Sequence, residues 1–278
     1  MSLPNGNIMP HLNRAAIEAA YTRAPGHEIE GGKFLSQESS AALAANVFGL
    51  FLDRPQLAPP LPGLEHLGWP AERVALEAIV RFPWSGGRHP CLDVLIETGT
   101  ALIGVESKRY EPFRPRGRPD LSAAYWRPVW GARMTGYQQV RDHLGDGSLQ
   151  FTHLDATQLV KHALGLCSAG RRARKLPVLV YVYAEPDVWP NERPIPRDDI
   201  LRHRQEIDFF RLRTRTDEVK FVAISYRELL AEWGNSADTE IQAHLKAIRE
   251  HFALRQGHGL ALPFETLWRS DEPLISPA

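Results

Sequence analysis

Two carboxylates and one ammonium, those of Asp93, Glu106 and Lys108, interrupt the apolar residues of segment 92–110, LDVLIETGTALIGVESKRY. Neighbouring carboxylates repel each other, and an unpaired charge that is partly buried costs several kcal/mol. Lys108, an arginine from elsewhere, a proton or a metal ion must therefore compensate. Among metals, Mg²⁺ suits carboxylate oxygens and accepts phosphate oxygens as further ligands. The alternative is a surface hairpin in which the acids pair with Lys108, an interaction worth only about 0–1 kcal/mol.

The two apolar runs of this segment predict two strands joined by an even turn, either of two residues (98–99) or of four (97–100). That register places Asp93 opposite Gly104, and side chains alternate between the two faces of a strand. The three charged side chains then share one face. Asp93 and Glu106 become diagonal neighbours, with Cβ atoms about 7–8 Å apart or somewhat less. We expect Gly104 to leave open space beside Asp93.

The same residues resemble the PD-(D/E)XK nuclease signature, in which Asp93 is followed on the next strand by Glu106-Ser107-Lys108. Leu92 stands at the usual proline position, and Pro90 lies three residues before the aspartate. More narrowly, the segments SSAALAANVFG, GVESK, QLVKHALGL and PVLVYVYAEP resemble a group of uncharacterised bacterial restriction-endonuclease-like proteins over most of the chain.

This resemblance implies metal-dependent hydrolysis of DNA phosphodiesters, in restriction or a related defence role. Asp93 and Glu106 would bind Mg²⁺, with Mn²⁺ as a substitute and the carbonyl of Ser107 as a third ligand. Lys108 would orient the attacking water or help to deprotonate it. The alternatives are a repair or recombination nuclease, a nuclease acting on RNA, and a non-catalytic nucleic-acid-binding protein that retains the fold.

In the same superfamily an acid on the first helix often joins the metal shell. Glu38, near the start of that predicted helix, is slightly favoured here over Glu77, at the edge of the first strand. Gln158, Lys161 and His162 share one face of a later helix. The resemblance gives Gln158 a catalytic role beside the phosphate or the water, but the spacing from Asp155 equally fits a helix-capping box. His162 is expected to be an ordinary polar helix residue.

Basic residues form local clusters, although the formal net charge of the chain is zero. The net charge therefore permits nucleic-acid binding but does not by itself indicate it. In the segment 111–150 arginines alternate with aromatic residues, namely Tyr125, Trp126, Trp130 and Tyr137. Such a mixture suits contact with nucleic acid, and it equally suits a small satellite core, which is favoured for the tryptophans. The candidate nucleic-acid-binding residues are Arg114, Arg116, Arg118, Arg127, Lys161, Arg171 and Arg172.

The whole chain has the composition of a soluble protein, with 43% hydrophobic and 24% charged residues. Its two cysteines have neither a disulfide framework nor metal-site spacing. No apolar stretch approaches the ~18 residues of a membrane span, and the first residues lack the apolar core of a secretory signal. We therefore expect a cytoplasmic protein that has no membrane partner.

Several secondary-structure elements must position the charged hairpin, and their alternation in the second half predicts an α/β fold with a mixed central sheet flanked by helices. The order resembles the αβββαβ core of restriction endonucleases, within a single nuclease-like domain over 1–278. The core would span about 36–186, with an insertion at about 111–150 and a C-terminal α/β extension at about 187–278. Because many such enzymes cut both strands as dimers, a homodimer is also expected. The predicted elements are a helix over 36–52 capped by Ser36, strand 76–84, two hairpin strands, a helix from about 132 to 144, helix 155–170, strand 176–186, helix 197–213, strand 219–226 and a helical stretch over 237–255.

Overall fold

The computed structural model describes residues 7–25, 31–84, 89–115 and 121–254. Its centre is one five-stranded mixed sheet with the strand order β1-β2-β3-β4-β5. The first three strands pair antiparallel, and β3, β4 and β5 run parallel. The strands are β1 (Ala71–Ile79), β2 (Cys91–Thr98), β3 (Ala101–Lys108), β4 (Leu176–Tyr183) and β5 (Lys220–Ser225).

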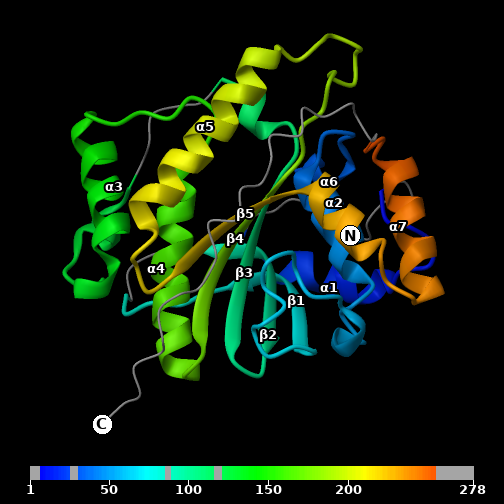
Figure 1. Cartoon of the computed structure of the whole chain (residues 1–278), viewed down its shortest axis with the longest axis horizontal. Helices are drawn as coiled ribbons and strands as arrows, with labels where there is room; N and C mark the ends of the chain where they lie inside the picture. Colours follow the sequence, from blue (N-terminus) through cyan, green and yellow to red (C-terminus); the bar gives the residue numbers. More distant parts are fainter. Residues whose placement is uncertain (1–6, 26–30, 85–88, 116–120, 255–278) are drawn as a thin grey trace.

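Helices cover both faces of this sheet, as Figure 1 shows. On one face lie α1 (Arg14–Arg23), α2 (Ser40–Gly49), α6 (Tyr226–Trp233) and α7 (Thr239–His251). On the other lie α3 (Thr135–Asp146), α4 (Ala156–Ala173) and α5 (Arg197–Thr214). The predicted α/β class, with its mixed sheet between two helical layers, is therefore confirmed, and it is consistent with a restriction-endonuclease-like core.

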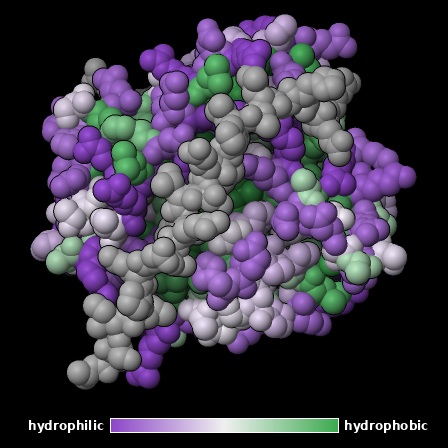
Figure 2. Space-filling model, in the orientation of Figure 1, coloured by the Kyte–Doolittle hydropathy of each residue, from purple (hydrophilic) through white to green (hydrophobic). Residues whose placement is uncertain are grey.

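The central strand β4 explains why the sheet has two cores. Val178, Val180 and Val182 pack into one hydrophobic cluster, whereas Leu179 and Tyr181 pack into the other. A strand covered on both faces needs a continuous apolar run rather than an alternating one. On the surface, Figure 2 shows mainly hydrophilic residues with small separate hydrophobic spots. Among the described residues, no helix combines the length and the apolar character needed to cross a bilayer.

Several element boundaries differ from the sequence-based prediction. Helix α2 begins at Ser40 and is capped by Ser39, whose side chain accepts from the backbone N–H of Ala42; Ser36 instead accepts from Glu38 N–H in the preceding turn. Strand β1 begins at Ala71, five residues before the predicted start at 76. A register shift between Ala71 and Arg73 leaves two consecutive charged residues exposed, which hides the alternation that identifies a strand.

The remaining elements follow the prediction more closely. Helix α3 lies within the insertion, and α4 continues to Ala173 rather than stopping near Gly170. The predicted C-terminal helical stretch is α7, which the short helix α6 precedes directly after β5. Helix α1 was not predicted, because only Ile17, Ala20 and Tyr21 of its ten residues are buried.

Candidate active site

The hairpin of β2 and β3 closes through a two-residue turn, Gly99-Thr100, rather than Thr98-Gly99. Val94 therefore pairs with Val105, and Leu95 with Gly104. The register differs from the predicted one by two residues, an even number, so Val94, Ile96, Ile103 and Val105 share one core as predicted. Asp93 still approaches the strand end that carries the Glu-Ser-Lys run.

The predicted open space at Gly104 is wrong. Gly104 lies opposite Leu95, and a Cβ atom there would come within 2.6 Å of Leu92 Cδ1 and 2.8 Å of Leu166 Cδ1. Both leucines belong to the core beneath α4. The glycine therefore allows close packing of that helix on the sheet and gives no room to a ligand.

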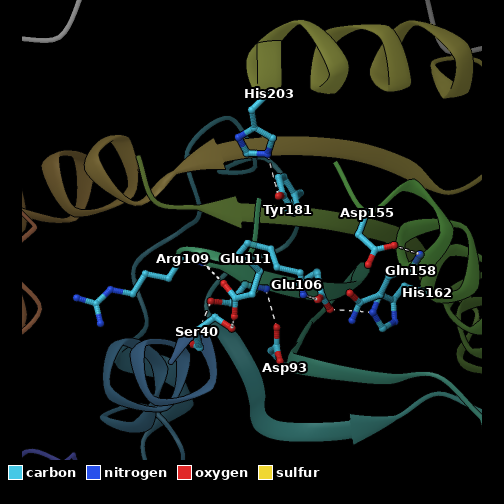
Figure 3. A network of polar contacts seen from close by, with 12 residues as sticks. Ser40, Asp93, Glu106, Arg109, Glu111, Asp155, Gln158, His162, Tyr181 and His203 are labelled. Carbon is cyan, nitrogen blue, oxygen red and sulfur yellow. Dashed lines mark hydrogen bonds and ion pairs between the residues drawn. The ribbon is translucent and has the colours of Figure 1, made fainter. Parts of the chain in front are cut away.

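Asp93 is partly buried at the open end of the hairpin. Its Oδ2 accepts a hydrogen bond of 2.6 Å from the backbone N–H of Ser107, just beyond the last paired residues of β2 and β3, Val94 and Val105. Figure 3 shows its side chain directed toward the strand that carries Glu106. Burial raises the pKa of Asp93 well above its ordinary value, and the negative charge of Glu106 raises it further. Burial and the charge of Glu106 thus both disfavour the ionised form of this carboxyl.

The pKa of Glu106 is shifted in the opposite direction, downward, although the residue is only 1% exposed. Its Oε1 contacts the ammonium of Lys108, and its Oε2 lies 2.8 Å from Nε2 of His162 on α4. Burial alone would raise the pKa of Glu106, but the proximity of Lys108 and His162 lowers it to about 2. Glu106 is therefore the ionised member of the pair of acids.

Lys108 closes the cluster with its side chain 12% exposed. Burial would lower its pKa, yet the neighbouring carboxylates, chiefly Glu106 and Asp93, raise it above the ordinary value. The side chain therefore stays an ammonium. In this arrangement the Lys108 ammonium can orient a water or stabilise negative charge.

A buried polar network holds the strand end behind these charges. The hydroxyl of Ser107 lies 2.6 Å from that of Tyr226 and also contacts the backbone carbonyl of Ser40 at the start of α2. The carboxylate of Glu111 accepts from the Ser40 hydroxyl, at 2.5 Å, and from the backbone N–H of Arg109, at 2.8 Å. Glu111 also contributes to the raised pKa of Lys108. Sequence reasoning did not consider Glu111, which lies just beyond the Glu-Ser-Lys run.

The two candidate further acids lie in different surroundings. Glu38 forms an ion pair with Arg114. Glu77 lies close enough to Asp93 to raise the pKa of that carboxyl, and it accepts a 3.4 Å hydrogen bond from the Cys91 thiol. Glu77 has a φ of +50°, a left-handed conformation that is uncommon for a residue other than glycine. Such strain is often found at functional sites.

Helix α4 brings its first turns to the cluster. Asp155 caps it by accepting from the backbone N–H of Gln158 at 2.9 Å, which is one half of the predicted capping box. Gln158 itself is partly exposed, whereas His162 is 2% exposed and faces Glu106, as Figure 3 shows. His162 is thus a helix residue, as expected, but a buried one whose imidazole contacts the Glu106 carboxylate. Lys161 lies with its Nζ 5.7 Å from the centre of the Tyr125 ring, so it is directed toward the insertion.

The insertion forms part of a core. Tyr125, Trp130 and Tyr137 are buried in the cluster beneath α3 and α4. Trp126 is 45% exposed, but its ring lies against Gly145 of α3 and beneath the guanidinium of Arg141. The prediction of a packing role is confirmed for the buried residues, but they belong to the main core on this face of the sheet rather than to a small satellite core.

The candidate DNA-contacting residues are spread over the molecule, and most have partners within the chain. Arg127 donates to the carbonyl of Pro83, Arg171 pairs with Glu218, and Arg172 donates to the carbonyl of Arg81 at 2.7 Å. Arg171 and Arg172 lie nine and ten residues after His162, about 14 Å or more further along the helix axis. Arg116 and Arg118 lie outside the described residues.

The oxygen ligands that the cluster offers are compatible with a hard divalent cation. Two carboxylates meet at one strand end, and within the described part of the chain Glu106 Oε2 is a buried oxygen without an aligned hydrogen-bond donor. Mg²⁺ needs only one or two protein carboxylates, because water and substrate phosphate supply its other ligands. No group of three or more His, Cys, Asp and Glu side chains placed to hold a metal occurs among the described residues. Asp93 and Glu106 could therefore supply two carboxylate ligands to Mg²⁺, with its other positions left to further groups, water or the substrate.

A family model described as restriction endonuclease associating with ARP matches residues 2–252. No curated protein and no solved structure matches the chain significantly. The matched region includes the whole sheet and every charged residue of the cluster, so the resemblance drawn from the Asp93 and Glu106-Ser107-Lys108 signature is confirmed at the level of the family. The chain belongs to the family of restriction endonucleases associating with ARP.

Proposed function

We propose that this protein is a Mg²⁺-dependent DNA endonuclease that hydrolyses phosphodiester bonds at the end of β3, in restriction or a related defence role. The observation that carries the proposal is the Lys108 ammonium held against the buried Glu106 carboxylate, with Asp93 beside them. A surface salt bridge would not account for this burial. Membership of a restriction endonuclease family supports DNA as the substrate.

Asp93 and Glu106 would hold the cation, with the Ser107 carbonyl as a third ligand and Mn²⁺ as a substitute. Of the two further acids, Glu77 is the better placed, because it acts on the pKa of Asp93 while Glu38 is paired with Arg114. A bound divalent cation would supply charge that polarises the phosphate and activates water. The ligand set leaves the remaining positions to water and to the substrate.

Lys108 would orient the attacking water and stabilise the negative charge that develops on the phosphate. Its raised pKa favours this role over that of the group that takes the proton from the water. Gln158 lies one helical turn before His162 on α4, so its amide would contact the phosphate or the water. The proposed DNA contacts are Arg114, Arg127, Lys161, Arg171 and Arg172.

Cleavage of supercoiled plasmid DNA in Mg²⁺ tests the proposal. Wild-type protein should nick or linearise the plasmid, and Asp93→Asn and Lys108→Ala should abolish this activity while thermal melts show that both variants fold. The matched control is Lys175→Ala, which removes an ammonium that contacts Glu72 and Glu97 at the other end of the hairpin and should leave cleavage intact. Full activity in both site variants would contradict the mechanism.

Two further measurements separate the alternatives. DNA binding without turnover, together with no stabilisation by divalent metal in a thermal melt, would indicate a non-catalytic protein that keeps the fold. Cleavage of RNA or of branched DNA in preference to duplex DNA would indicate the other nuclease classes. Because cutting both strands commonly needs two active sites, we also propose a homodimer, which sedimentation with and without DNA measures.

A further inference from the structure

A cleft of about 320 Å³ lies between the segment that follows β3 and the start of α5. It is distinct from the charged cluster, and its lining combines aromatic rings, prolines and charged side chains. The lining residues are Phe113, Trp189, Arg193, Pro194, Pro196 and Asp199.

This cleft adjoins the end of β3. Tyr110, two residues beyond Lys108, stacks on Trp189 with ring centroids 5.4 Å apart and an interplanar angle of 24°. The carbonyl of Lys108 accepts a 2.8 Å hydrogen bond from Ala184, which begins the segment that leads to Trp189. A nucleotide in the cleft would therefore lie beside the strand end that carries Lys108.

The segment that presents Trp189 is closed by its own hydrogen bonds. The backbone N–H of Trp189 donates to the carbonyl of Arg193 at 2.8 Å, and that of Ile195 donates to the carbonyl of Asp187 at 2.9 Å. Val188 and Pro194 form an antiparallel bridge between the same two arms. The indole is thus held in place before any ligand arrives, which lowers the entropy that binding costs.

The charges around the cleft are asymmetric. The guanidinium groups of Arg114 and Arg193 lie over the Trp189 ring, 5.9 Å and 5.4 Å from its centre. Asp199, on the α5 side, has a side chain that is 40% exposed and lies 3.8 Å from Nε2 of His153. A phosphate inside the cleft would meet this carboxylate, whereas the N–H groups of a nucleobase edge can donate to it. Phosphates belong on the arginine side.

We propose that this cleft binds one unpaired nucleobase of single-stranded or locally opened DNA. Because Tyr110 already stacks on Trp189, the base displaces the exposed Arg193 guanidinium from the indole and stacks in its place, and its flanking phosphates contact Arg114 and Arg193. In a fully paired duplex both faces of each base are covered by stacking. The cleft can therefore bind only a base that is extruded from the duplex or belongs to a single strand. The inference rests on the proposed nuclease function, because it assigns this base to the substrate that Lys108 acts on.

Fluorescence anisotropy with labelled oligonucleotides tests the proposal, using the full chain in Ca²⁺ to follow binding. Wild-type protein should bind a single strand, and a duplex with an internal unpaired bubble, more tightly than the fully paired duplex. Trp189→Ala should weaken binding to the first two by about tenfold, the size of one lost base stack, and leave duplex binding unchanged. Trp189→Phe should retain most of the affinity.

The chain offers a matched control in Trp126, which is also partly exposed beside an arginine but lies against α3 rather than in the cleft. Trp126→Ala should leave all three affinities unchanged. Arg193→Ala, which alters an exposed side chain, should weaken single-strand binding and decides the question if Trp189→Ala does not fold. Equal losses in Trp189→Ala and Trp126→Ala, or no loss in either, would overturn the proposal.

The outcomes separate the cleft from the nuclease. If wild-type protein cleaves DNA and Trp189→Ala binds every substrate normally, the cleft assignment is wrong and the nuclease proposal stands. If the cleft variants lose single-strand binding but no DNA is cleaved, the nuclease proposal is wrong and the binding site stands. Tighter binding of an RNA strand of the same sequence would overturn the assignment to DNA.

Discussion

Each end of strand β2 carries two carboxylates around one lysine ammonium, in opposite surroundings, and at the turn end Arg73 also pairs with Glu97. At the open end of the hairpin, Asp93 lies with Glu106 and Lys108, whose side chains are 2% and 12% exposed. The pKa of Asp93 is raised by burial and by the charge of Glu106. This end therefore holds charges that the folded protein does not fully compensate.

At the turn end, Lys175 contacts Glu72 at 2.8 Å and Glu97 at 3.0 Å. The side chain of Glu72 is 57% exposed and that of Glu97 is 27% exposed. The hydrogen bond to Glu72 raises the pKa of Lys175, so each of these charges has a partner or water. Such exposed ion pairs contribute about 0–1 kcal/mol to stability.

The comparison indicates that charge composition alone does not mark the candidate site, whereas the burial of these charges does. Removing charges from water costs several kcal/mol, and a protein retains such an arrangement where it has a use. Four variants test the contrast.

The largest effect is expected from Glu106→Gln. The neutral amide removes the charge that pairs with Lys108 and one of the two proposed metal ligands, so cleavage should fall by about 10²–10³-fold or more. The initial rate of plasmid cleavage in Mg²⁺ measures this loss. Glu97→Gln, the corresponding change at the turn end, should cleave at the wild-type rate, and equal losses in the two variants would remove the distinction between the ends.

The sequence predicted which face each hairpin residue occupies, because any even turn gives the same alternation. It could not predict the register, since Thr98-Gly99 and Gly99-Thr100 are both two-residue turns. The actual choice makes Leu95, rather than Asp93, the partner of Gly104. The fold class was predictable for a similar reason, because the continuous apolar run of β4 identifies a covered central strand whatever its exact neighbours are.

The residues that sequence reasoning missed lie in contacts between distant segments. His162 meets Glu106 across 56 positions of the chain, and the helical periodicity of α4 gives its face without saying what that face covers. Glu111 meets Ser40 across 71 positions. The favoured choice of Glu38 over Glu77 depended on the rotation of α2, which no periodicity fixes when every residue from Ala41 to Gly49 is buried.

The next effect is expected from His162→Ala. The imidazole lies 2.8 Å from Glu106 Oε2, and a group that orients a metal ligand typically contributes about 10–100-fold to metal affinity. Isothermal titration of the full chain with Mn²⁺ measures the change. His143→Ala, on α3, is the control and should bind Mn²⁺ as the wild type does. Unchanged affinity in His162→Ala would make the histidine a packing residue.

A smaller effect is expected from Asp93→Asn, and it is a gain in stability rather than a loss of function. Because the folded pKa of Asp93 is raised, the folded state keeps a proton that the unfolded state has released above about pH 4, so stability falls as the pH rises toward the folded pKa. The asparagine should abolish this decline while still accepting from Ser107, and should be more stable near neutral pH by about 1–2 kcal/mol. Urea unfolding of the metal-free protein across this pH range measures it. A variant less stable than the wild type at neutral pH would mean that the carboxyl is not under strain.

The smallest effect is expected from Glu72→Gln at the turn end. Its carboxylate is largely exposed, so the lost contact with Lys175 should cost about 0–1 kcal/mol, and the cost should shrink further in high salt because exposed charges are screened. Urea unfolding at low and high salt measures the cost in stability and its decrease with salt. Plasmid cleavage should stay at the wild-type rate. A cost as large as the change in Asp93→Asn, or one that persists in high salt, would mean that the turn-end cluster is shielded from solvent. Burial would then fail to distinguish the two ends of β2, and the case for a site at Asp93 would depend on the cleavage measurements alone.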